Sequence, residues 1–274
     1  MRKDDTVDVL MQMICVAAAL MLLAPILYAV SVSFMAPEDI LTKNYNLLPP
    51  KPTLQNYVKV FSASPILRFM LNSFVIATVC SISRVLIAAC SAFAFAFYEF
   101  KGKNLLFMLT MTTIMIPPDV LVVQNYVTVS RMNLLNTYLG ICTIFLVSAN
   151  NIFMMRQQFL SFSKSLHEAA ALDGAGAFTF FTKILLPTSK PILFTIFISS
   201  FVNVWNQYVW PMLVANETTM RPIQVGITML KDRESSAFGP VMAGTVIALI
   251  PTILVFILFL KKIVAGMMSG ALKE

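Results

Sequence analysis

The sequence predicts an all-α, polytopic membrane protein with six transmembrane helices, for three reasons. The chain of 274 residues is 58% hydrophobic and only 12% charged, whereas soluble domains carry about 25% charged residues. Its mean hydropathy is +0.80. Apolar stretches near the length of about 20 residues that crosses the hydrocarbon core recur along the chain. Because no soluble domain or internal repeat separates them, residues 1–274 are expected to form a single transmembrane domain.

The six expected spans are separated by connections of very different lengths. In order, they are residues 9–34, 71–98, 105–127, 138–155, 191–214 and 241–264. The first is expected to be a retained span, because the apolar run after Arg2 and Lys3 is too long for a signal peptide. Asn150 interrupts the fourth span, and Asn203 and Gln207 interrupt the fifth. Lipid tolerates such amides only where they face protein or a watery cavity.

Positive charges set the expected orientation in the membrane. With six spans, more Lys and Arg fall on the side of the two termini, and the short loop 99–104 and the pair Lys261-Lys262 support this bias most strongly. Both termini are therefore expected in the cytoplasm. The same orientation places the polar segment 156–190, between the fourth and fifth spans, in the cytoplasm.

Several functional classes are disfavoured by composition. The net charge of +7 comes from basic residues scattered at span ends rather than gathered on one face, which disfavours nucleic-acid binding. The four Cys lie inside apolar runs, and His167 has no second ligand nearby, so no metal site is expected. An ion-coupled carrier should bury carboxylates, yet Glu99 and Asp119 lie only at span edges. A membrane-embedded enzyme is disfavoured as well, because it would need a metal cluster or a nucleophile beside a base, and the chain has one His and no acidic residue that is expected to be buried.

The cytoplasmic segment 160–187 is expected to form two short helices at a bend. Good helix formers end at Asp173-Gly174-Ala175-Gly176, and a glycine past a helix end accepts the left-handed cap conformation. A second helix from residue 177 would display Phe178, Phe180 and Phe181 before the fifth span. Small residues and exposed aromatics suit a docking surface. An amphipathic helix resting on the lipid headgroups is the alternative, and the residues alone do not decide between them.

The spacing within this segment resembles a known motif. Glu168-Ala169-Ala170, a glycine six residues after the Glu, and Ile184-x-Leu186-Pro187 are similar to the EAA loop of permease subunits of bacterial ABC importers. Leu71-Asn-Ser-Phe74, Ser91-Ala-Phe-Ala-Phe95 and the segment 203–211 are similar to the carbohydrate-uptake branch, above all to the smaller permeases for glycerol-3-phosphate and maltose.

This resemblance implies a set of partners. They are a second, different permease subunit, two copies of an ATPase that bind ATP and Mg²⁺, an extracytoplasmic solute-binding protein, and the lipid of the bacterial inner membrane. The chain itself would be non-catalytic and would hold no cofactor, which agrees with the lack of a Gly-x-x-x-x-Gly-Lys-Ser/Thr run. The residues expected to couple to the ATPase are Glu168, Ala169, Ala170, Asp173, Gly174, Phe178, Phe181 and Pro187.

Polar and aromatic side chains mark candidates for the solute pathway. They are Asn203, Trp205, Asn206, Gln207 and Tyr208 in the fifth span, together with Arg84 in the second. Amides beside aromatic faces suit a polyhydroxyl solute. Alternatively, the amides bind neighbouring helices, while Tyr208 and Trp210 lie in the outer aromatic belt. Arg84 could attract an anionic solute or bond the carbonyls of a neighbouring helix. Pro117-Pro118 is expected to break the third span.

The expected function is ATP-driven import of a sugar or polyol derivative, with sn-glycerol-3-phosphate or an oligosaccharide as the preferred solute. This choice rests on the resemblance of the fifth span. A permease for an amino acid, phosphate or osmolyte is the alternative within the same family, and an ion-coupled carrier is the alternative outside it.

Overall fold

The computed structural model describes a helical chain that divides into two compact units. The described residues are 4–40, 46–162, 164–233 and 238–271. Unit 1 comprises residues 1–68 and 226–250, and unit 2 comprises residues 69–225 and 251–274. Within the described ranges the regular elements are all helices, in agreement with the all-α class expected from composition.

Unit 1 contains the long apolar helix α1. Its elements are α1 (Asp4–Ser33), α2 (Pro37–Ile40), α3 (Gln55–Ala63), and parts of α14 (Ile223–Arg233) and α15 (Phe238–Ala271). The buried Asn56 of α3 donates from Nδ2 to the carbonyls of Ser33 at 3.0 Å and Met35 at 2.8 Å. These bonds satisfy carbonyls that the end of α1 leaves without a helical partner. Gly239 of α15 leaves no room for a side chain against Asn56, so α15 packs closely on α3.

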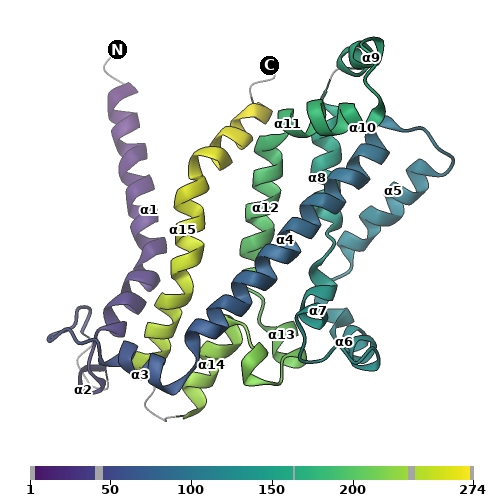
Figure 1. The fold of residues 1–274 in the computed structure, drawn as a ribbon. Coiled ribbons are helices and arrows are strands. Elements are labelled where there is room, and N and C mark those ends of the chain that lie inside the picture. The colour runs from purple at the N-terminus through teal and green to yellow at the C-terminus, as the bar shows by residue number, and fades with distance from the viewer. Residues whose placement is uncertain (1–3, 41–45, 163, 234–237, 272–274) are drawn as a thin grey trace. The chain divides into compact units, whose positions relative to one another are not determined.

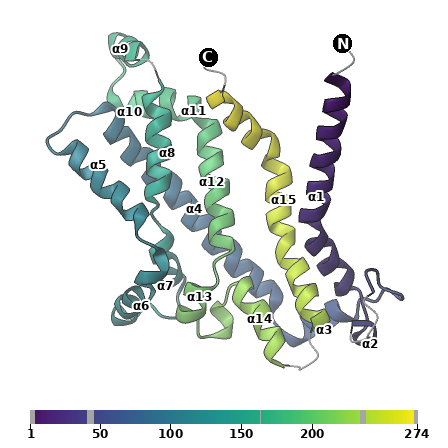
Figure 2. The ribbon, with the colours of Figure 1, turned by 180° about the vertical axis from the view of Figure 1, so that it is seen from behind.

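Unit 2 contains the remaining spans and the connecting loops. The long helices are α4 (Ile66–Phe97), α8 (Ala149–Leu160) and α12 (Lys190–Trp205). The shorter elements are α5 (Lys103–Thr112), η1 (Thr113–Met115), η2 (Pro118–Leu121), α6 (Val122–Arg131), α7 (Tyr138–Cys142), η3 (Thr143–Phe145), α9 (Lys164–Leu172), α10 (Ala177–Thr179), η4 (Phe180–Leu185), α11 (Leu186–Thr188), α13 (Val209–Val214) and η5 (Thr218–Met220). In both views, α9, α10 and α11 lie at one end of unit 2, and α6, α7 and α13 lie at the other (Figures 1 and 2).

The described helices divide into continuous and broken candidate spans. Residues 8–33, 66–97 and 238–259 are each long and apolar enough to cross a membrane. Three further candidates are pairs of helices joined at a sharp bend. The bend is 91° between 103–115 and 118–131, 51° between 138–145 and 149–160, and 74° between 177–188 and 190–205. Six candidates result if each pair counts as one span. The fifth differs from its predicted range of 191–214, because its helix already ends at Trp205.

The break in the fourth span exposes backbone carbonyls, and α4 supplies donors to them. Arg84 donates from Nε to the carbonyl of Phe145 at 2.6 Å, and Ser83 donates from Oγ to that of Leu146 at 3.0 Å. An unsatisfied carbonyl in the apolar core would cost several kcal/mol. The polar residues of α4 therefore stabilise the broken span beside it.

The Leu71-Asn-Ser-Phe74 motif holds the end of unit 2 that contains α13. Asn72 is buried and donates to the carbonyls of Thr219 and Arg221, each at 3.0 Å, while its Oδ1 accepts from the Tyr138 hydroxyl at 2.7 Å. Ser73 accepts at 2.8 Å from the backbone N–H of Ile223. The two polar residues thus tie the beginnings of α7 and α14 to α4.

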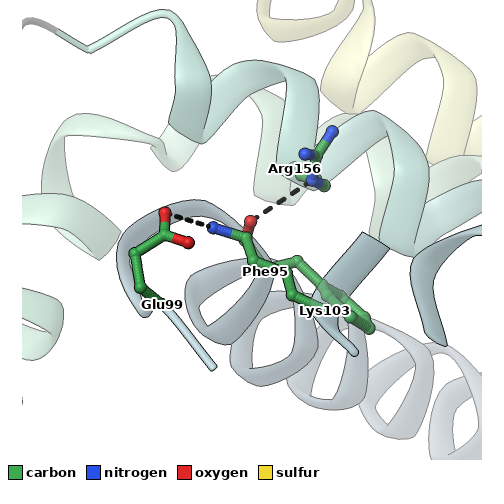
Figure 3. A network of polar contacts seen from close by, with 4 residues as sticks. All are labelled: Phe95, Glu99, Lys103 and Arg156. Carbon is green, nitrogen blue, oxygen red and sulfur yellow. Dashed lines mark hydrogen bonds and ion pairs between the residues drawn. The ribbon is translucent and has the colours of Figure 1, made fainter. Parts of the chain in front are cut away.

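At the opposite end, Arg156 joins three helices. Its Nε donates to the carbonyl of Phe95 near the end of α4 at 3.4 Å (Figure 3). Its guanidinium lies 4.1 Å from the ring centroid of Phe107 on α5. A cation at a helix C-terminus also complements the helix dipole. Glu99 and Lys103 form an ion pair at 3.0 Å across the short turn between α4 and α5. The ends of α4, α5 and α8 are therefore held together beneath α9.

Candidate functional site

The bend in the loop is built by a glycine cap. Gly174 has φ +79°, so it adopts the left-handed conformation expected from the sequence. Its N–H donates to the carbonyl of Ala171 at 3.0 Å, and the N–H of Ala175 donates to that of Ala170 at 2.9 Å. This pair of bonds is the Schellman arrangement, which satisfies the last carbonyls of a helix. The chain thereby leaves α9 in a defined direction rather than as an open loop.

The loop has an inward and an outward side. Ala170 and Phe180 are buried in an apolar cluster with residues of α4, α8 and α12. The expectation that Ala170 would be exposed for close approach of a partner is therefore wrong for the isolated chain, and so is the exposed placement of Phe180. His167, where no metal site was expected, is half-buried against aromatic rings.

The outward side carries most of the residues predicted to dock. Glu168, Ala169, Asp173, Gly174 and Phe178 are exposed. Phe178 is 79% exposed. Phe181 is half-buried beside Phe93 of α4, with ring centroids 4.8 Å apart. The outward side therefore combines the carboxylates of Glu168 and Asp173 with an exposed aromatic ring.

A wide helical turn leads from the loop to the fifth span. Residues 180–185 form a π-helical segment, and Pro187 follows in the single turn of α11. Proline has no N–H and its ring collides with the carbonyl four residues earlier in a regular helix. The wider preceding turn agrees with this restriction. Thr188 donates from Oγ1 to the carbonyl of Ile184 at 2.6 Å, which satisfies one acceptor near the bend.

A polar cavity of about 700 Å³ lies in unit 2, between the broken spans. Its polar lining includes Arg84 on α4, Asp119 on η2, Asn125 on α6, Asn150 on α8, Asn203 on α12 and Gln207 just after α12. A guanidinium, a carboxylate and several amides can together bind a hydroxylated or charged solute through directed hydrogen bonds.

Arg84 is the cation of this cavity and is held from two sides. Besides the carbonyl of Phe145, it donates from Nη1 to Oδ1 of Asn203 on α12 at 3.1 Å. One planar fork thus connects the second, fourth and fifth spans. Because the guanidinium has five N–H donors, these two bonds leave further donors for a solute or water. Bonding to a neighbouring carbonyl, one of the two roles considered for Arg84, is confirmed.

The structure separates the other pathway candidates. Asn203 and Gln207 line the cavity, and Gln207 donates to the carbonyl of Asn203 at 3.3 Å. Both residues also line a second hollow of about 570 Å³ along α12, which includes Asn206. Trp205 is 2% exposed and stacks on Phe201 in the protein interior, so it does not line either space. Tyr208, half-buried in the break after α12, does not line them either.

Two features of the site were missed by sequence reasoning. Trp210, expected in the outer aromatic belt, is buried and donates its indole N–H to the carbonyl of Ile141 at 3.1 Å. Asp119 lines the cavity, although its place at a span edge suggested no role. The sequence feature that could have indicated the position of Asp119 is the adjacent Pro117-Pro118 pair. The chain bends by 91° there, and the bend brings Asp119 to the wall of the cavity.

Apolar candidate spans around a polar cavity define a membrane-transport component, and the family comparison agrees. The family described as binding-protein-dependent transport system inner membrane component matches residues 40–268. The chain belongs to this family. It is thus a multi-pass permease subunit of a binding-protein-dependent transport system, and the resemblance to ABC importer permeases is confirmed.

Individual relatives are similar over nearly the whole chain. The sn-glycerol-3-phosphate transport system permease protein UgpE of Brucella abortus (strain 2308) is 32% identical over 254 residues, which are 89% of this chain and 90% of that protein. UgpE of Yersinia pestis bv. Antiqua (strain Antiqua) is 29% identical over 271 residues, which are 96% of each chain.

A solved structure has the same fold. A chain from the crystal structure of a bacterial ABC transporter involved in the import of the acidic polysaccharide alginate matches with a TM-score of 0.84 and 24% identity. The match covers 95% of this chain and 98% of that chain. This likeness supports the fold.

Proposed function

We propose that the chain forms part of the transmembrane pathway of an ATP-driven importer for a sugar or polyol derivative, with sn-glycerol-3-phosphate as the first candidate solute. The names of the similar permeases support this solute class. A second, different permease would complete the pathway, and an extracytoplasmic binding protein would deliver the solute. Two ATPase subunits would bind ATP and Mg²⁺ and perform the hydrolysis. Both termini and the loop 160–187 would face the cytoplasm.

The observation that carries the ATPase assignment is the outward side of the loop. The glycine cap and the buried Ala170 and Phe180 fix the backbone, yet Phe178 remains 79% exposed and Glu168 is exposed as well. A rigid segment that leaves an aromatic ring in water is typical of an interface anchor. A helix that rests on lipid would instead present Lys and Arg on its polar face. Between residues 167 and 178, where the structure describes the side chains, the charged residues that are exposed are Glu168 and Asp173.

Arg84 supports an anionic or strongly hydroxylated solute. A half-buried cation such as Arg84 is screened less than a charge on the open surface, so it attracts a phosphate more strongly. The amides of Asn203 and Gln207 beside it can donate to and accept from hydroxyl groups. Asp119 on the cavity wall would oppose a fully charged solute near its own position. The Arg84 side of the cavity is therefore the proposed place for a phosphate group.

Docking is tested by co-purification of the complete transporter from membranes. The double variant Glu168→Lys with Phe178→Ser changes only exposed side chains, so the permease should insert and fold as before. If the two residues together contribute about 2 kcal/mol to docking, ATPase recovery at limiting concentration should fall by roughly 30-fold. Glu38→Lys, which makes the same charge change on exposed α2, is the matched control. Undiminished ATPase recovery with the double variant would refute the docking assignment.

The solute is tested by uptake into vesicles that contain the complete transporter and its binding protein. Uptake of labelled sn-glycerol-3-phosphate is compared with that of glycerol, maltose, inorganic phosphate and glycine betaine. Preference for the phosphate ester or the sugar supports the proposed class. Exclusive uptake of phosphate or betaine would instead assign the chain to an importer for another small solute.

A further inference from the structure

Three aromatic rings join the inward side of α9 to the end of α4. The ring centroid of His167 lies 4.7 Å from that of Phe180 and 5.3 Å from that of Phe97. Phe97 and Phe180 are themselves 5.3 Å apart, in an edge-to-face arrangement. All three distances fall in the range of attractive aromatic pairs. Each ring therefore contacts the other two, and the three elements α9, α4 and η4 meet at one point.

His167 is the member of this triangle that belongs to the docking helix. It precedes Glu168 in the chain, so the residue that faces inward and the residue that faces outward are direct neighbours on α9. In the described part of α9, His167 makes the aromatic contacts both to α4, through Phe97, and to η4, through Phe180. Its ring is neither exposed nor part of a cluster of possible metal ligands among the described residues.

The far end of the same connection is the cavity. Phe97 is the last residue of α4, and Arg84 lies on the same continuous helix, roughly 20 Å along its axis at 1.5 Å per residue. Arg84 in turn holds the broken fourth span and Asn203. An unbroken helix transmits displacement along its axis, whereas the broken spans can bend at their breaks. The path from α9 to the cavity therefore runs most directly through α4.

We propose that His167 is a positioning residue that fastens the docking helix α9 to α4, so that movement of α9 reaches Arg84. This inference rests on the proposed docking of residues 160–187 to an ATPase. His167 contributes to coupling through its ring contacts with Phe97 and Phe180. A planar ring at this position is required, and the imidazole nitrogens are not.

The test uses vesicles with the complete transporter, and measures ATP hydrolysis and uptake of sn-glycerol-3-phosphate in the same sample. His167→Ala should lower the solute transported per ATP by about tenfold, within the usual range of coupling between sites, while the ATPase subunits still co-purify in wild-type amounts. His167→Phe keeps the ring and should retain wild-type coupling. Phe256→Ala, which removes an exposed ring from α15, is the control for loss of an aromatic side chain.

A second readout needs no solute. Maleimide labelling of a cysteine placed at the exposed Leu86 of α4, in a chain whose native cysteines are replaced by serine, should change when ATP is added. This ATP-dependent change should disappear with His167→Ala and return with His167→Phe. Undiminished coupling in His167→Ala by both readouts, or loss of ATPase binding in that variant, would overturn the inference. Failure of the wild-type chain to bind any ATPase would instead refute the docking proposal on which it rests.

Discussion

Replacing Asn72 by alanine should destabilise unit 2 more than replacing any exposed amide. The side chain is 1% exposed and bonds two backbone carbonyls and the Tyr138 hydroxyl. Three bonds at about 1 kcal/mol each give a loss of about 3 kcal/mol, and the lower average of about 0.6 kcal/mol per bond measured within membranes still gives about 2 kcal/mol. Alanine also leaves the two carbonyls without their donor.

The assay is thermal unfolding of the purified chain in detergent, followed by circular dichroism. A loss of about 3 kcal/mol should lower the apparent Tm by about 6 to 12 °C. Asn104→Ala, on the exposed face of α5, is the matched control and should leave the Tm within about 2 °C of the wild type. If Asn72→Ala matched this control, the hydrogen bonds of Asn72 would not hold the end of unit 2, and the reasoning would be refuted.

Three further substitutions test the backbone and the interior by the same assay. In Gly174→Ala the added Cβ meets no atom within 4 Å, so the substitution should cost about 1–2 kcal/mol of stability through the positive φ alone. Gly176→Ala, whose Cβ is equally free of neighbours but whose φ is −66°, is the control and should be near neutral. Trp210→Phe removes a buried indole N–H from its carbonyl acceptor on α7 and should cost about 1–3 kcal/mol; an unchanged Tm would contradict the hydrogen bond. Gly239→Ala places a Cβ 2.6 Å from Oδ1 of Asn56 and should destabilise unit 1, and pairing it with Asn56→Ala should cost less than the sum of the two single losses.

The helical class and the glycine bend could be predicted because their causes are local. Apolar length requires a span whatever surrounds it, and Gly174 ends α9 because few other residues adopt φ +79°. The Arg84 contact to a carbonyl was also foreseen as one of two roles, since a charge in an apolar span needs a partner. In each case the residue type alone determined the outcome.

The orientation of apolar side chains could not be predicted in the same way. In a soluble helix, polar residues mark the outside, but a membrane span can be apolar towards both lipid and protein. The sequence therefore gave no reason to bury Trp210 or Phe180. The end of the fifth span was misjudged for a related reason: residues 209–214 are apolar enough to continue a span, and the break at residues 206–208 is visible only in the structure.

The bonds between α4 and the broken fourth span have a consequence for synthesis of the protein. Ser83 and Arg84 precede the carbonyls of Phe145 and Leu146 in the chain, so a ribosome completes the donors before the acceptors. The kinked segment can thus enter the bilayer beside a helix that already offers hydrogen bonds. Asn72 follows the same order over a longer interval, because its acceptors, the carbonyls of Thr219 and Arg221, are made much later. The Asn72 amide therefore lacks these acceptors until the segment around residue 220 has been synthesised, and that segment then completes the packing of α4.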